Sequence, residues 1–132
     1  MTRLAVAIVV AHALVLLGHE FAHRDLGVDL SPWQAAFAYS VIVAAPVLAA
    51  VLILTRRLTL GFGLLAASML GALCFGVYHH YMLVSHDHVS HLPPGASQGL
   101  FRGTAAAMAA LELVGMAVGV WGILSTGRTR RG

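Results

Sequence analysis

Four apolar stretches constrain the fold of this chain more than any other feature. They cover residues 4–23, 33–55, 60–84 and 104–124, and a helix needs about 20 mostly apolar residues to cross a bilayer. With 59% hydrophobic and only 10% charged residues, the chain lies far from the balance of soluble globular proteins. Backbone in lipid must satisfy its own hydrogen bonds, which favours helices. We therefore predict a single all-α domain over residues 1–132, an integral-membrane antiparallel bundle of four transmembrane helices.

The positive charges predict the orientation of this bundle. The chain has a formal net charge of +3 and contains arginine but no lysine. One end of the four-span arrangement collects Arg3, Arg56, Arg57, Arg128, Arg130 and Arg131, and the other end has Arg24 and Arg102. By the positive-inside rule both termini are cytoplasmic. We expect the plasma (inner) membrane as the location and the bilayer as the main partner, with no nucleic acid, in a homo-oligomer or as a subunit of a larger membrane complex.

Local signals indicate where the helices begin and end. Ser31 followed by Pro32 is typical of a helix start, and Pro46 predicts a kink in the second span. Pro93 stops whatever precedes it, so the third helix is expected to project from the membrane as far as His91. The lone cysteine, Cys74, excludes an intramolecular disulfide.

Seven of the eight histidines lie in "GHEFAH" (18–23) and "YHHYMLVSHDHVSH" (78–91). At about 100° per residue, a helix places His12, His19 and His23 in one stripe of the first span. If the third helix continues, His80, Asp87 and His91 repeat this spacing. The first and third spans both run outward, so His19 and His23 should lie at the depth of His79 and His80. Glu112 enters from the fourth span at a depth between His12 and His19, about 14 Å of helix rise from Gly103.

Ionisable groups inside a membrane usually face the bundle interior, where they pair or bind something. Imidazole is the commonest ligand for transition metals, and helix bundles build metal sites from inward side chains. We therefore predict a metal site on the extracytoplasmic half, with His19, His23 and His80 as ligands. His79 is the substitute for His80, Glu112 is a carboxylate ligand or a catalytic group, and His12 serves a second site or a relay.

The segment "HDHVSH" (86–91) lies at or beyond the water boundary. Its ionisable residues His86, Asp87, His88 and His91 are further candidate metal ligands, or else a metal-collecting patch, a pH-sensitive loop or a solvated helix end. The scarcity of carboxylates argues against calcium and magnesium, whereas a site of histidines with one glutamate suits copper, zinc or iron.

The pentapeptide "HEFAH" (19–23) matches H-E-x-x-H, in which two histidines bind zinc and the glutamate is the general base. It resembles this part of site-2-type intramembrane proteases, which implies a catalytic role for Glu20. Those enzymes take an aspartate ligand from a later span, for which Asp87 is the candidate here. The chain would then be a metalloprotease.

Two other resemblances imply oxidative chemistry. "HEFAHR" (19–24) and "HDHVSH" are similar to the histidine boxes of integral-membrane di-iron hydroxylases and desaturases, although a clear H-x-x-H-H box is absent. Two histidines on different spans could also clamp haem b, with His12 or His19 opposite His79 or His80. The sequence leaves a metal-dependent oxidoreductase or redox subunit, a copper or zinc handling protein, a cytochrome subunit and a protease open. The nearly apolar cytoplasmic half favours a one-sided site over a transporter.

Overall fold

The computed structural model describes residues 1–129, and over that range it contains helices and no strands. Four of its helices are long and apolar enough to cross a membrane, and they cover Thr2–Asp25, Pro32–Leu54, Leu58–Met82 and Gln98–Gly127. Large apolar side chains point outward along them, as for Leu17, Trp121 and Leu124, which are 58–68% exposed. Such a surface is suited to lipid rather than to water.

Two of the four spans contain π-helical turns. The helices are α1 (Thr2–Asp25), α2 (Pro32–Phe37), η1 (Ala38–Ala44), α3 (Ala45–Leu54), α4 (Leu58–Val77), η2 (Tyr78–Met82) and α5 (Gln98–Thr129), of which η1 and η2 are π-helical. The first π-turn comes directly before Pro46, which lacks an N–H and crowds the preceding turn. At the predicted kink the structure shows this π-helical segment, and the kink itself stays a prediction. The predicted helix start at Ser31 and Pro32 is confirmed.

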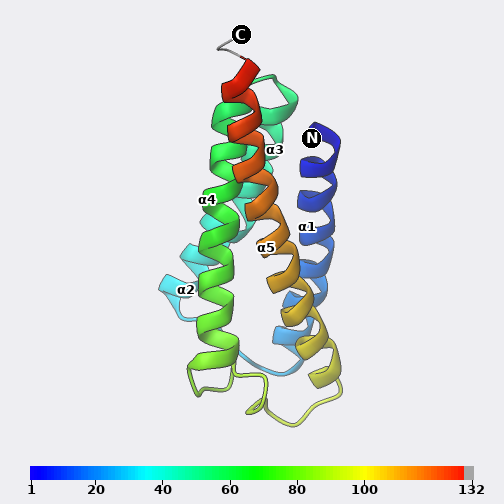
Figure 1. Cartoon of the computed structure of the whole chain (residues 1–132). Coiled ribbons are helices and arrows are strands. Elements are labelled where there is room, and N and C mark those ends of the chain that lie inside the picture. Colours follow the sequence, from blue (N-terminus) through cyan, green and yellow to red (C-terminus); the bar gives the residue numbers. More distant parts are fainter. Residues whose placement is uncertain (130–132) are drawn as a thin grey trace.

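The spans run up and down in alternation (Figure 1). The N-terminus, the α3–α4 turn and the end of α5 lie at one end, here called the terminal end, and the connections 26–31 and 83–97 form the other, the loop end. Arg3, Arg56 and Arg57 thus share the terminal end. Arg130 and Arg131 lie outside the described residues, as does the side chain of Arg128.

Helix α5 packs against both α1 and α4, and α3 packs mainly on α4. At the terminal end an apolar core joins α1, α3, α4 and α5 through residues such as Ile8, Ile53, Leu65 and Val118. At the loop end a second cluster joins Ala22, Leu26, Val28, Leu92 and Phe101. Buried polar side chains, among them His12, His19 and Glu112, lie outside these two apolar clusters.

The third span does not project to His91. It ends in η2 at Met82, where the N–H of Leu83 donates to the carbonyl of Tyr78 five residues earlier. The chain then returns through an irregular loop, and α5 begins at Gln98 rather than near residue 104. The expectation that a continuous helix places His80, Asp87 and His91 on one stripe was therefore wrong. The helix ends in the π-turn at Met82, before it reaches Asp87.

Candidate metal centre

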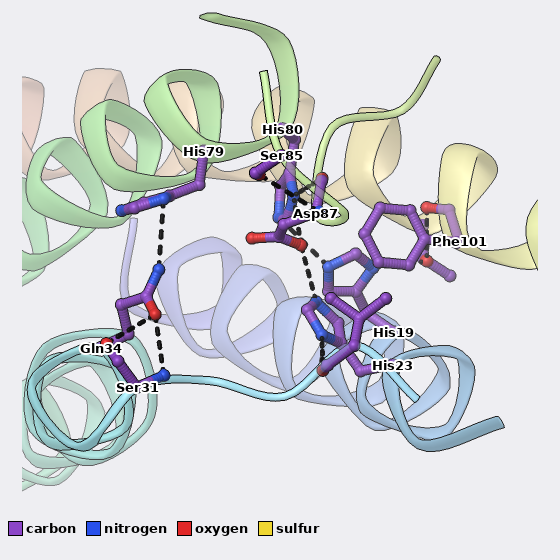
Figure 2. Close-up of polar contacts among 11 residues, drawn as sticks. His19, His23, Ser31, Gln34, His79, His80, Ser85, Asp87 and Phe101 are labelled. Carbon is purple, nitrogen blue, oxygen red and sulfur yellow. Dashed lines mark hydrogen bonds and ion pairs between the residues drawn. The ribbon is translucent and has the colours of Figure 1, made fainter. Parts of the chain in front are cut away.

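Three buried imidazoles converge at the loop end of the bundle. His19 and His23 lie one turn apart on α1, and His80 reaches them from η2 (Figure 2). One ring nitrogen of each can be chosen so that all lie within 4.8 Å of one another. The Nε2 atoms of His19 and His80 are only 3.2 Å apart. The histidines of the first and third spans, which the sequence predicts at one depth, thus meet in one group.

The other ring nitrogen of each histidine has a fixed hydrogen-bond partner. His23 Nδ1 lies 3.0 Å from the carbonyl of Val28, and His80 Nδ1 lies 3.1 Å from the carbonyl of Asp87. A carbonyl can only accept, so both Nδ1 atoms must carry the proton. In a neutral imidazole this leaves a lone pair on Nε2.

His19 is held between two side chains. Its Nδ1 lies 2.9 Å from Thr104 Oγ1. The same hydroxyl also lies 2.7 Å from the Leu100 carbonyl. On the other side of the ring, His19 Nε2 lies 3.2 Å from His80 Nε2, within hydrogen-bonding distance. Because His80 carries its proton on Nδ1, His80 Nε2 accepts and His19 Nε2 donates in this pair. A bound cation would take the place of this proton between the two nitrogens.

Asp87 adds an anionic oxygen to this group. Its Oδ1 lies 3.3 Å from His23 Nε2 and 3.2 Å from His80 Nδ1. The His80 Nδ1 proton lies between the Asp87 backbone carbonyl, at 3.1 Å, and Oδ1. Burial acts to raise the pKa of Asp87, but the hydrogen bond and charge of His80, with the charges of the other imidazoles, lower it below its usual value. A buried carboxylate is stabilised by positive charge beside it, so Asp87 is a candidate for a fourth metal ligand.

The loop after η2 brings Asp87 back to the site. The N–H of Val89 donates to the carbonyl of His80 at 3.0 Å, and Arg102 Nε donates to the carbonyl of Val89 at 2.8 Å. Both contacts fold residues 83–91 over the end of η2. Asp87 is therefore a candidate ligand through a loop, not through the helical stripe that the sequence suggested.

Phe101 forms the apolar wall of the site. It is fully buried, and its ring lies 4.6, 4.9 and 5.3 Å, centroid to centroid, from the rings of His19, His23 and His80. It also belongs to the apolar cluster under the loops. This packing limits the rotation of the imidazoles and excludes water from one side.

A cavity of about 60 Å³ adjoins the three histidines and Asp87. A single water needs on the order of 10–15 Å³, so the cavity has room for an ion and a few small ligands. Glu20 and Glu112 also line it. Glu20 is the middle residue of H-E-x-x-H, and its Oε1 accepts from Arg24 Nε at 2.8 Å. Both predicted catalytic carboxylates therefore border the cavity.

His79 does not join the group. Ser31 donates from its backbone N–H and its hydroxyl to Gln34 Oε1, at 2.8 and 2.6 Å. This orients the amide NH₂ of Gln34 toward His79 Nδ1, 3.3 Å away (Figure 2). His79 Nδ1 is then the acceptor and Nε2 carries the proton, which is the opposite tautomer to that of His23 and His80.

His12 and Glu112 form a separate buried pair deeper in the bundle. His12 Nε2 lies 3.2 Å from Glu112 Oε1, and both residues are 2% exposed. Glu112 thus connects this pair to the cavity that it lines. The structure places His12 as a partner of Glu112 and not within reach of the three-histidine group.

The remaining histidines lie on the outer rim. His88 and His91 approach each other to 3.1 Å between their Nδ1 atoms, in an exposed position. His86 is exposed as well, and it lines an open polar pocket with His79 and Asp87. These three histidines are not among the residues that converge on the buried site.

No known protein family, curated protein or solved structure matches this chain. The residues of the site themselves therefore carry the functional argument. Thr104 and Phe101 are the contributors that sequence reasoning missed. Both residues lie at or near the predicted start of the fourth span. A threonine and a phenylalanine do not by themselves indicate a metal site, so there was no reason in the sequence to select them.

Proposed function

We propose that this chain holds a transition-metal ion between His19, His23, His80 and Asp87, and that it acts as a small membrane metalloenzyme or redox subunit. The observation that carries the proposal is the convergence of three buried imidazoles, whose candidate ligand nitrogens lie within 4.8 Å of one another, beside the buried Asp87 carboxylate. Metal-binding histidines usually donate their other N–H to a carbonyl or a carboxylate. Three nitrogens and one oxygen suit zinc, iron or copper.

The surroundings support a one-sided site over a transport path. The terminal half of the bundle is filled by the apolar core around Ile8, Leu65 and Val118. Ser68, a buried polar residue in α4, donates its hydroxyl to the Leu65 carbonyl of its own helix. Three converging imidazoles also favour a single ion over haem b, which uses two ligands on opposite faces of a flat ring.

Metal content of the purified protein tests this proposal. Wild type prepared in detergent without chelator, or loaded with zinc and desalted, is expected to hold about one ion per chain. The His19→Ala/His80→Ala variant should hold less than a tenth of that. The control is His88→Ala/His91→Ala, which removes an equally close but exposed pair. Wild type without metal, or an equal loss in the control, would overturn the proposal, and a Soret band would point to a cytochrome.

A second candidate is a metal-dependent hydrolase, favoured by the place of Glu20. This residue lies between two of the converging histidines in sequence and lines their cavity, as the general base of an H-E-x-x-H hydrolase would. Glu20→Gln should leave the metal content unchanged and abolish hydrolysis of peptide or ester substrates. Hydrolysis that persists in this variant would rule out the hydrolase.

A further inference from the structure

Helix α1 separates from the second span toward the loop end. Near the terminal end, Ile8 and Val9 belong to the same core as Ala49 and Ile53 of α3. Farther along, α1 and α2 lie well apart (Figure 1). The space between them is a groove of about 610 Å³, within the range of about 300–1,000 Å³ that is usual for small-molecule sites.

The groove changes from apolar to charged along its length. Ala13, Leu16 and Leu17 of α1 line the deep part, opposite Ile42 and Val43 of η1. At the loop end it is lined by Glu20, His23, Arg24 and Asp29. From Ala13 to Arg24 the helix rises about 16 Å. The groove therefore matches an elongated molecule with an apolar chain and a polar head.

The charged part of the groove continues into the metal cavity. Leu16, Glu20, His23, Ala38 and Ile42 line both spaces. A head group seated beside Glu20 and His23 would thus adjoin the proposed metal ligands. The apolar chain would lie along α1 and η1, with its end toward the bilayer centre.

Apart from residues 28–30 of the connection, the walls of the groove belong to two helices long and apolar enough to span a membrane, so lipid is its natural solvent. The groove is charged at the loop end and apolar toward the bilayer centre, which is the orientation of a lipid in the leaflet on the loop side. A molecule from that leaflet can therefore enter without turning over. Glu20 and Asp29 outnumber Arg24, whose Nε is already held by Glu20 at 2.8 Å. This balance disfavours an anionic head.

We propose that the groove binds a single-chain amphiphile with a neutral oxygen-bearing head, such as a long-chain alcohol, drawn sideways from the bilayer. The inference deepens the proposed function by naming the substrate class of the metal site. It rests on the proposed function only where it treats the bound amphiphile as a substrate. The groove is formed by protein side chains, so binding itself needs no metal.

The test is photo-cross-linking of hexadecanol carrying a diazirine in mid-chain to the protein in lipid nanodiscs. The chain of the probe should label residues 13–24 and 35–43. Leu17→Trp fills the groove from a position that is already 68% exposed, and its control is Leu14→Trp, 65% exposed and outside the groove. Labelling of these segments should fall at least fivefold in Leu17→Trp and stay unchanged in Leu14→Trp.

A second pair of variants tests the opposite wall. Ala38→Trp should reduce labelling to a similar degree, and Ala36→Trp, on the exposed side of the same segment, should not. Labelling spread evenly over the lipid-facing sides of α4 and α5, or unaffected by both groove variants, would overturn the proposal. Stronger labelling by the fatty acid of the same length would overturn the neutral head.

The failure of this inference can be told apart from failure of the metal centre. His19→Ala/His80→Ala should lose the metal but keep at least half of the labelling in the groove. If metal is bound and no groove labelling is found, only the substrate class is wrong. If labelling is found and no metal is bound, the groove stands as a lipid site without the proposed chemistry.

Discussion

The chemistry of the site is decided by which ring nitrogen of each histidine carries the proton. The carbonyl groups of Val28 and Asp87 require a proton on Nδ1 of His23 and of His80, respectively. Gln34 requires the reverse on His79. Two buried histidines that are adjacent in sequence, His79 and His80, thus have different roles because their hydrogen-bond partners differ.

Sequence reasoning reached His19, His23 and His80 because helical spacing and membrane depth are both readable from an apolar sequence. It preferred His80 and kept His79 as a substitute, because the distinction between them depends on the π-turn and on the Gln34 amide. Asp87 was among the candidates for the wrong geometric reason. Its position depends on a loop whose backbone hydrogen bonds have no sequence signature.

The buried His12–Glu112 pair makes a prediction at the residue scale. Replacing His12 with Leu leaves the Glu112 carboxylate buried without its partner, and a broken buried pair typically costs about 3–5 kcal/mol. We expect each single variant, His12→Leu or Glu112→Leu, to lower the free energy of unfolding. The double variant should be less destabilised than the sum of the singles, by about 1–3 kcal/mol. Unfolding in mixed detergent measures this, and additive effects would contradict the pairing.

At the scale of the helices, close contact between α4 and α5 depends on glycines of α5. A Cβ atom at Gly119 would lie 2.6 Å from the backbone N of Ala66, and at Gly122 it would lie 2.3 Å from the Phe62 ring. Small residues let helices approach closely in membranes. This contact holds α5, and with it Thr104 and Phe101, in place against the rest of the site.

Gly119→Ala should therefore destabilise the protein, since the added methyl group meets the backbone of α4 and the helices must move apart. The matched control is Gly103→Ala on the same helix, where an added Cβ has no neighbour within 4 Å. We expect the midpoint of thermal unfolding in detergent to fall by several degrees in Gly119→Ala and to stay or rise slightly in Gly103→Ala. A similar midpoint for both variants would show that the close approach does not matter.

The helical content and the four long apolar spans followed from composition and segment length, because a bilayer leaves few alternatives for the backbone. The ends of the spans were less predictable. The third span ends in a π-turn at Met82, well before Pro93. Helix α5 starts at Gln98, ahead of the apolar stretch that begins at residue 104. Such ends depend on tertiary contacts that helix periodicity does not encode.

At the scale of the whole molecule, the three-histidine group lies at the loop end, and the arginines Arg3, Arg56 and Arg57 lie at the terminal end. On the positive-inside rule we propose that the loop end faces away from the cytoplasm. An ion would then be acquired outside the cytoplasm, and a lipid would reach it from the outer leaflet.

Cysteine labelling tests this orientation in intact cells. In a Cys74→Ala background, Ser90→Cys at the loop end should react with a membrane-impermeant maleimide. Thr55→Cys, exposed at the terminal end, should react only after the cells are permeabilised. The opposite pattern would reverse the orientation and place the metal site on the cytoplasmic side.

X-ray absorption at the metal edge of the zinc-loaded wild type tests the central claim most directly. Three imidazoles at about 2.0–2.1 Å and one carboxylate oxygen at about 2.0–2.2 Å are expected around the ion. His79→Ala should leave this spectrum unchanged, whereas His80→Ala should remove one imidazole. A shell of oxygen atoms without imidazole scattering, or a loss of imidazole in His79→Ala and not in His80→Ala, would contradict the site described by the structure.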